Sequence, residues 1–212
     1  MPLVHSRPSR PLEEFGSGLY RLVDLELTCW PGSLQRCWSG SDEYREVVQC
    51  GFVDFEYLPV AKRIIATRSY ESLCWPRHNR VLSPYFCALT GITNECLAAS
   101  AVSFADVFSA VGEGDRILLA NGDDVEILNE NAIIHGISSS PLVGFDVREF
   151  LAQLLGVPVS ACISSQLPGL VRDCDASSGH PHQALHDCWS VLRVLARGLG
   201  CSLVDLTHLP LG

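Results

Sequence analysis

The sequence predicts a single α/β domain built on one mixed sheet with helices on both faces. Three observations lead to this prediction. The chain has 212 residues, 47% of them hydrophobic, which is enough for one domain with a full core. Its first apolar segments are strand-like and joined by turns, and its later segments alternate between helix-like and strand-like patterns. An antiparallel meander followed by βα units is typical of a mixed sheet.

The meander is predicted from the first three strands. Residues 19–28 alternate between apolar and polar with a period of two, and residues 45–55 and 60–70 also have strand character. The short connection Tyr57-Leu58-Pro59 predicts an antiparallel hairpin between the second and third strands.

The βα units are predicted from the second half of the chain. Apolar side chains recur at helical spacing from residue 104 to residue 111, and Gly112 and Gly114 end that helix. Further strands are predicted at 116–120 and 142–145, and further helices at 124–134, 147–155 and 182–199, with a loop at 175–179. The expected organisation is a loose lead-in over residues 1–18, one domain over 19–200 and a C-terminal tail over 201–212.

Composition argues against several classes of protein. None of the ten cysteines forms a Cys-x-x-Cys pair, so we expect reduced core cysteines rather than a zinc knuckle or a disulfide scaffold. The net charge of −9 argues against broad binding to a long duplex, which requires a basic face. The chain has no run of 18 apolar residues and no apolar signal core at its N-terminus, so we expect a cytoplasmic protein that does not enter a membrane.

The first strand carries two acidic residues on one face. Asp24 and Glu26 are two residues apart, and alternate residues of a strand share a face. Two carboxylates so close raise each other's pKa unless a cation lies between them, and a divalent metal with oxygen ligands is the simplest such cation. The alternative is a half-buried strand whose carboxylates face solvent.

Two later segments carry further candidate residues. Asp123 and Asp124 lie at a strand-to-helix turn, where open α/β sheets place ligands, although the same residues could simply cap the helix. The last helix is predicted to begin at His182 and carries Asp187, which suggests a metal carboxylate with a histidine general base nearby. The alternatives are zinc bound by His182 and His186, four residues apart on one helical face, or an exposed histidine-rich cap.

In this order, the motifs resemble those of the DEDDh 3′–5′ exonucleases, whose fold is ribonuclease H-like. Within that family they are similar to the Eri-1/3′hExo-type exoribonuclease branch. The segments that carry the resemblance are VDLELTCW at 23–30, EVVQCG at 46–51, FCALTGIT at 86–93 and HQALHD at 182–187. The resemblance covers about residues 20–199, and the ordered set is far more specific than any one motif.

The resemblance implies a set of site residues and a chemistry. The implied metal ligands are Asp24, Glu26, Asp124 and Asp187, and the implied general base is His182. Two Mg²⁺ or Mn²⁺ ions about 4 Å apart would bind between the carboxylates. The expected reaction releases nucleoside 5′-monophosphates from the 3′ end of single-stranded or 3′-overhanging nucleic acid, with RNA favoured. The alternatives are a DNA exonuclease of proofreading or repair and a non-catalytic nucleic-acid-binding module. The oligomeric state stays open, a homodimer included.

Substrate contacts are expected from Leu27, Thr28, Trp30 and Phe86, with Tyr85 as a further candidate, because single-stranded ends stack on aromatic or apolar side chains. Core packing is the alternative role for each.

The chain departs from the pattern of the branch at three places. Leu27 stands where a small Ala is usual, and His186 stands where an acidic residue is frequent. Asn121-Gly122 replaces a Trp-Gly pair, which leaves Asp123 as a rival to Asp124. We prefer Asp124 because the apolar pair Ile127-Leu128 follows it at the offset seen in the family.

Overall fold

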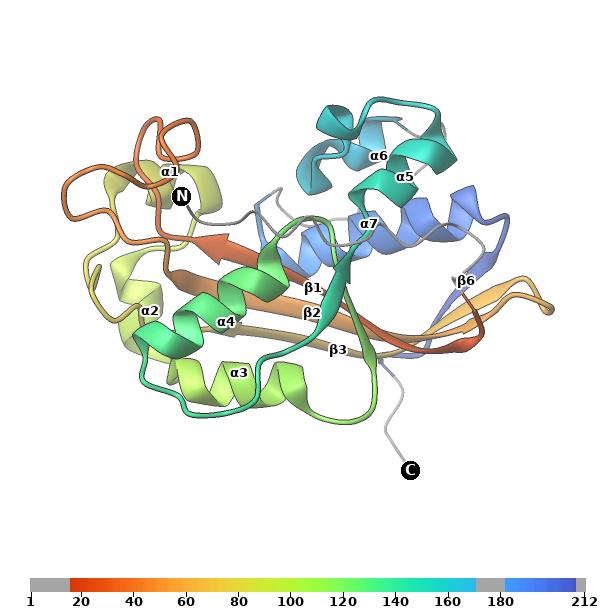
Figure 1. The fold of residues 1–212 in the computed structure, drawn as a ribbon, viewed down its shortest axis with the longest axis horizontal. Coiled ribbons are helices and arrows are strands. Elements are labelled where there is room, and N and C mark those ends of the chain that lie inside the picture. The colour runs from red at the N-terminus through yellow and green to blue at the C-terminus, as the bar shows by residue number, and fades with distance from the viewer. Residues whose placement is uncertain (1–15, 171–181, 209–212) are drawn as a thin grey trace.

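The structure is a computed structural model that describes residues 16–170 and 182–208. Its centre is a six-stranded sheet with the order β5-β4-β1-β2-β3-β6 (Figure 1). The antiparallel meander consists of β1 (Gly18–Leu27), β2 (Val47–Leu58) and β3 (Arg63–Leu73). The parallel strands are β4 (Ile117–Ala120) beside β1, β5 (Gly144–Asp146) beside β4, and β6 (Ser202–Asp205) beside β3.

Helices cover both faces of this sheet. The helices are α1 (Pro84–Thr90), α2 (Asn94–Ser100), α3 (Phe104–Gly112), α4 (Asp124–Ile134), α5 (Arg148–Leu155), α6 (Leu167–Leu170) and α7 (Ala184–Gly198), with short 3₁₀ turns η2 (Val159–Ala161) and η3 (Ser164–Gln166). One core packs α5 and α7 against Leu22 of β1, and the other packs α3 and α4 against Val23 and Leu25 (Figure 1). The predicted mixed sheet with an antiparallel meander, βα units and flanking helices is therefore confirmed.

Three local features differ from the sequence prediction. Strand β6 lies in the segment expected to be a tail, because four residues are too few to show a period and their pairing with β3 arises only in the folded chain. The segment 83–100, for which the sequence predicts no helix or strand, forms α1 and α2. The last helix begins at Ala184 rather than at His182, because His182 has a left-handed backbone with φ 63° that a helix cannot include.

Other expectations can be checked in the same residues. The cysteines of the described part of the chain are all unpaired, and Cys50 and Cys188 lie in the core as predicted. Cys87 is half-buried. Within the described ranges, the helices are too short or too polar to cross a lipid bilayer. The predicted loop at 175–179 and the lead-in up to residue 15 lie outside the described residues.

Candidate active site

The carboxyl ends of β1 and β4 meet at one edge of the sheet because the two strands are parallel. Asp24 and Glu26 lie at this end of β1, on the face opposite Val23 and Leu25. Their exposed fractions are only 9% and 8%. The alternative of two solvent-facing carboxylates is therefore wrong, since β1 is covered on both faces.

Asp187 is brought to this edge by the seating of α7 on the sheet. A side chain at Gly51 of β2 would place its Cβ only 2.3 Å from the backbone nitrogen of Leu185, so the glycine permits the close approach. Gln49 accepts a hydrogen bond from the Ala184 N–H at 3.0 Å, and Glu71 accepts one from the Leu185 N–H at 3.3 Å. These contacts satisfy free N–H groups of the first turn of α7, the turn that carries Asp187.

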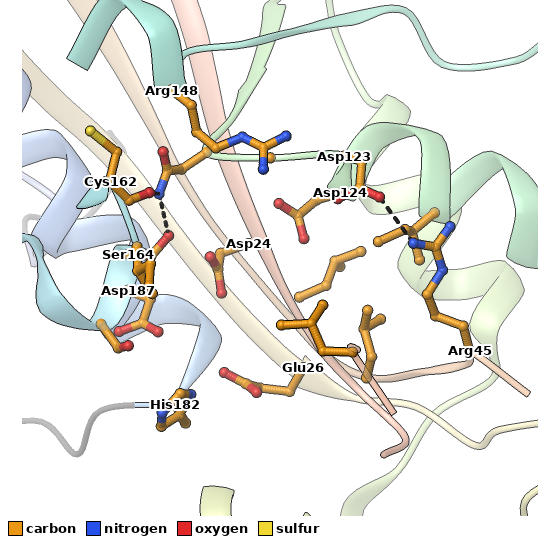
Figure 2. Close-up of a pocket in the computed structure, with 18 of the residues that line it drawn as sticks. Asp24, Glu26, Arg45, Asp123, Asp124, Arg148, Cys162, Ser164, His182 and Asp187 are labelled. Carbon is orange, nitrogen blue, oxygen red and sulfur yellow. Dashed lines mark hydrogen bonds and ion pairs between the residues drawn. The ribbon is translucent and has the colours of Figure 1, made fainter. Parts of the chain in front are cut away.

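The turn between β4 and α4 supplies the next acidic residue. Asp123 is half-exposed and forms an ion pair with Arg45 at 2.9 Å. Figure 2 shows the Asp123 carboxylate directed toward Arg45, whereas the Asp124 carboxylate is directed toward Asp24. This arrangement supports the choice of Asp124 over Asp123.

Asp24, Glu26, Asp124 and Asp187 all line one cavity of about 360 Å³, together with His182 (Figure 2). One ligand atom each from Glu26, His182 and Asp187 lies within 4.8 Å of the others. The cavity thus gathers, from β1, α4, α7 and the residues before α7, the five residues that the sequence singled out for metal binding and catalysis.

Crowding of these carboxylates makes their charged forms costly. Burial raises the pKa of Glu26 to about 8, and the charges of Asp187 and Asp124 raise it further in the same direction. Burial likewise raises the pKa of Asp187 and that of Asp124 to about 7. The pKa of Asp24 is raised by burial and then by Asp124, Asp187 and Glu26, which shows that the four carboxylates interact.

This donor set fits a hard divalent cation. The Oδ1 atom of Asp187 is buried and has no hydrogen-bond partner among the described residues, as expected of an oxygen that serves as a ligand. Carboxylate oxygens are the preferred ligands of Mg²⁺ and Mn²⁺, and a cation would neutralise the mutual repulsion described above.

His182 reaches the cavity from outside the helix. It lies five residues before Asp187 with φ 63°, and its backbone N–H donates a hydrogen bond to the Asp187 carboxylate. The alternative zinc site, with His182 and His186 on one helical face, is wrong because His182 precedes α7.

A second cavity, of about 380 Å³, adjoins the first. The two cavities share six lining residues: Leu25, Glu26, Leu27, Leu34, Trp38 and His182. The second cavity is lined further by Trp30, Tyr85 and Leu89. Leu27 and Trp30 therefore lie where a base could stack.

Thr28 and Phe86 do not belong to the lining of either cavity. Thr28 is 2% exposed, and its hydroxyl donates to the Tyr44 carbonyl and accepts from the Glu46 N–H. Phe86 is 1% exposed and packs in the core beneath α1. The prediction that these two residues contact substrate is corrected, because their side chains are already used inside the protein.

Sequence reasoning missed several residues of the first cavity. Arg45, Arg148 and Ser164 line it and were not singled out as site residues, and Trp38 and Leu34 reach both cavities from the loop between β1 and β2. Arg45 and Arg148 lie at the ends of predicted elements and the others in loops or short turns, and spacing does not show which of these positions face a cavity. The one sequence signal near these residues was the replacement of Trp-Gly by Asn121-Gly122, which marks a change in the lining of the first cavity.

Comparison with known proteins shows similarity in structure only. No family model matches the chain, and no curated protein matches it by sequence. Among solved structures, the nuclease domain of 3′hExo, described as a DEDDh family member bound to rAMP, has a TM-score of 0.67 at 20% identity over 87% of this chain and 92% of that domain.

Two further structures extend the comparison. A 3′-exonuclease structure on recognition of the histone mRNA stem-loop gives a TM-score of 0.67 at 20% identity over 87% of this chain, which spans 65% of that chain. Escherichia coli Exonuclease I with a dA16 oligonucleotide gives 0.57 at 13% identity over 86% of this chain and 42% of that chain. The resemblance predicted from the sequence motifs is thus confirmed at the level of structure: the chain has the ribonuclease H-like fold of the DEDDh nuclease domain of 3′hExo.

Proposed function

We propose that this protein is a metal-dependent 3′–5′ exonuclease that releases nucleoside 5′-monophosphates, with RNA as the favoured substrate. The observation that carries the proposal is the convergence of Asp24, Glu26, Asp124 and Asp187 on one cavity beside His182. The DEDDh fold found by comparison supports the same class of reaction. A non-catalytic binding module would have no need for four mutually repelling buried carboxylates, which cost stability when empty.

The four carboxylates would hold two divalent cations, Mg²⁺ or Mn²⁺. When bound, such cations lower the pKa of a water and stabilise negative charge on the scissile phosphate. His182 would accept a proton from the attacking water, since it lies beside Glu26 and Asp187 and lines both cavities.

The second cavity would bind the 3′-terminal nucleotide. Its Trp30, Trp38 and Tyr85 side chains offer aromatic surface for stacking, and Leu27 lines both this cavity and the one that holds the carboxylates. Because Glu26 and His182 belong to both cavities, a base in the second would hold its phosphate near the carboxylates of the first.

RNA is favoured over DNA because the sequence motifs match the exoribonuclease branch and the structures with TM-scores of 0.67 are titled with rAMP and a histone mRNA stem-loop. A DNA substrate is the second candidate, favoured by the similarity to Exonuclease I bound to dA16. A free single-stranded or 3′-overhanging end is the expected partner. Cytoplasmic location stays a prediction of the sequence.

The test is degradation of matched RNA and DNA oligonucleotides by purified protein with Mn²⁺. A 5′ label should give a ladder that shortens from the 3′ end, and a 3′ label should appear at once in a nucleoside 5′-monophosphate. Asp24→Asn, which removes one charge with little change in shape, is the inactive control. Activity that survives removal of metal with EDTA, or equal activity in Asp24→Asn, would contradict the proposal. Faster loss of the DNA strand would select the second candidate.

A further inference from the structure

One wall of the acidic cavity is formed by residues with no role in the chemistry above. Asn121 follows β4 directly, and Ser164 begins η3, more than forty residues later in the chain. Both line the cavity, and Figure 2 shows Ser164 beside Asp24. The Ser164 hydroxyl is thus placed to donate to the Asp24 carboxylate, an interaction that would favour the charged form of Asp24.

The amide of Asn121 has only one orientation that satisfies its neighbours. Its Nδ2 atom donates to the Cys162 carbonyl at 3.0 Å and to the Ser164 hydroxyl at 2.8 Å. A flipped amide would place its oxygen against the Cys162 carbonyl, and two acceptors cannot share a hydrogen bond. Both amide hydrogens are therefore committed, one of them to Ser164.

The orientation of Asn121 also decides the direction of the next hydrogen bond. A serine hydroxyl has a single proton, and the Ser164 oxygen already accepts from Asn121. The Ser164 proton is left free to donate to the neighbouring Asp24 carboxylate. Such a bond would hold one oxygen of Asp24 toward Ser164 and leave the other oxygen to the cavity.

The cost of this arrangement indicates that more than packing is involved. The Oδ1 atom of Asn121 is buried and has no partner within the described residues. A buried acceptor without a partner lowers the stability of the fold, a loss that an apolar residue at this position would avoid. Metal-binding carboxylates, by contrast, are commonly oriented by neighbouring hydrogen bonds.

We propose that Asn121 and Ser164 are positioning residues, which through a relay of two hydrogen bonds hold the Asp24 carboxylate in the orientation that binds a divalent cation. This inference rests on the proposed function of the acidic cavity. It assigns the relay to two residues outside the four segments that carry the sequence resemblance.

The test is Mn²⁺ binding to metal-free protein by calorimetry, which does not depend on turnover. Ser164→Ala should weaken Mn²⁺ binding about 10–100-fold, the usual effect of losing a hydrogen bond to a metal ligand. The matched control is Ser165→Ala, which removes a hydroxyl from the next residue of the same cavity and should leave the affinity unchanged. Ser164→Thr keeps the donor and should bind Mn²⁺ nearly as well as the parent.

Asn121→Leu tests the other half of the relay. It removes both donors in a side chain of similar size, so it should shift Mn²⁺ affinity in the same direction as Ser164→Ala. In both variants, the Mn²⁺ concentration that gives half-maximal nuclease activity should rise by the same factor as the dissociation constant, and excess Mn²⁺ should restore turnover. A merely structural defect would not be repaired by metal.

Two outcomes overturn the relay. Equal Mn²⁺ affinity in Ser164→Ala and the parent would show that Ser164 does not position Asp24. If Asp24→Asn binds Mn²⁺ weakly in the same experiment, the proposed function stands and only the relay fails. Equal weakening in Ser164→Ala and Ser165→Ala would point to general disturbance of η3. If Asp24→Asn itself binds Mn²⁺ as the parent does, the proposed metal site fails together with the relay.

Discussion

Glu26 offers a direct test of the electrostatics of the cavity through its effect on stability. Its pKa is raised from 4.5 to about 8 in the folded protein, with burial as the main cause. Between these two values, the folded state binds more protons at Glu26 than the unfolded state does. Stability must therefore fall as pH rises through this window, and the loss is complete above the folded pKa.

The magnitude follows from the same two values. Between pH 5 and pH 8 the linkage relation gives a loss of about 3.5 kcal/mol for Glu26. A chain of this size changes its Tm by about 2–4 °C per kcal/mol. Glu26→Gln removes the ionisation, so its Tm relative to the parent should rise by about 7–14 °C between pH 5 and pH 8 when no metal is present.

The assay is thermal unfolding of metal-free protein across this pH range. Comparing the variant with the parent at each pH cancels any fixed effect of the substitution on packing. Glu149→Gln, which changes an exposed glutamate on α5, is the control and should show no such trend. Mn²⁺ should raise the Tm of the parent at pH 8 far more than that of Glu26→Gln. A difference between Glu26→Gln and the parent that stays constant with pH would refute the reasoning.

Three further outcomes can be checked by activity and stability assays. Asp124→Asn should remove nearly all nuclease activity, whereas Asp123→Asn should keep most of it because Asp123 is turned toward Arg45; the reverse result would exchange their roles. His182→Ala should lower turnover about 10²–10⁴-fold and abolish the acidic limb of the pH–rate profile, since a protonated imidazole cannot accept a proton from water, while His186→Ala should keep both. Gly51→Ala should displace the first turn of α7, so nuclease activity should fall and the free energy of unfolding should drop by about 1–3 kcal/mol. Unchanged activity and unchanged stability would show that α7 does not need this close contact.

Local patterns were sufficient to predict most elements and the acidic motifs. The period of two in β1 predicted a strand with Asp24 and Glu26 on one face, and α4 begins and ends where its pattern and the following Gly136 indicated. These features could be predicted because they depend on the alternation or helical spacing of neighbouring residues. The order of the motifs, rather than any one of them, led to the DEDDh resemblance.

The tertiary structure decided everything that depends on contacts between distant segments. It showed that Asp123 pairs with Arg45, nearly eighty residues earlier, whereas Asp124 lies toward Asp24, which supports the preference for Asp124 drawn from the sequence. It also placed Thr28 and Phe86 inside the protein, because burial is set by the segments that cover a residue and not by its own neighbours.

The cavity wall formed by Asn121 and Ser164 is the clearest case of a feature that depends on contacts between distant segments. Neither residue lies in the four segments that carry the sequence resemblance, and the hydrogen bonds from Asn121 to Cys162 and Ser164 join the end of β4 to the segment around η3. Which carboxylates the protein carries, and on which predicted elements they lie, could be read from the order of the residues alone. Only the folded chain determined how each carboxylate is oriented, because orientation depends on hydrogen-bond partners that folding brings together from separate parts of the chain.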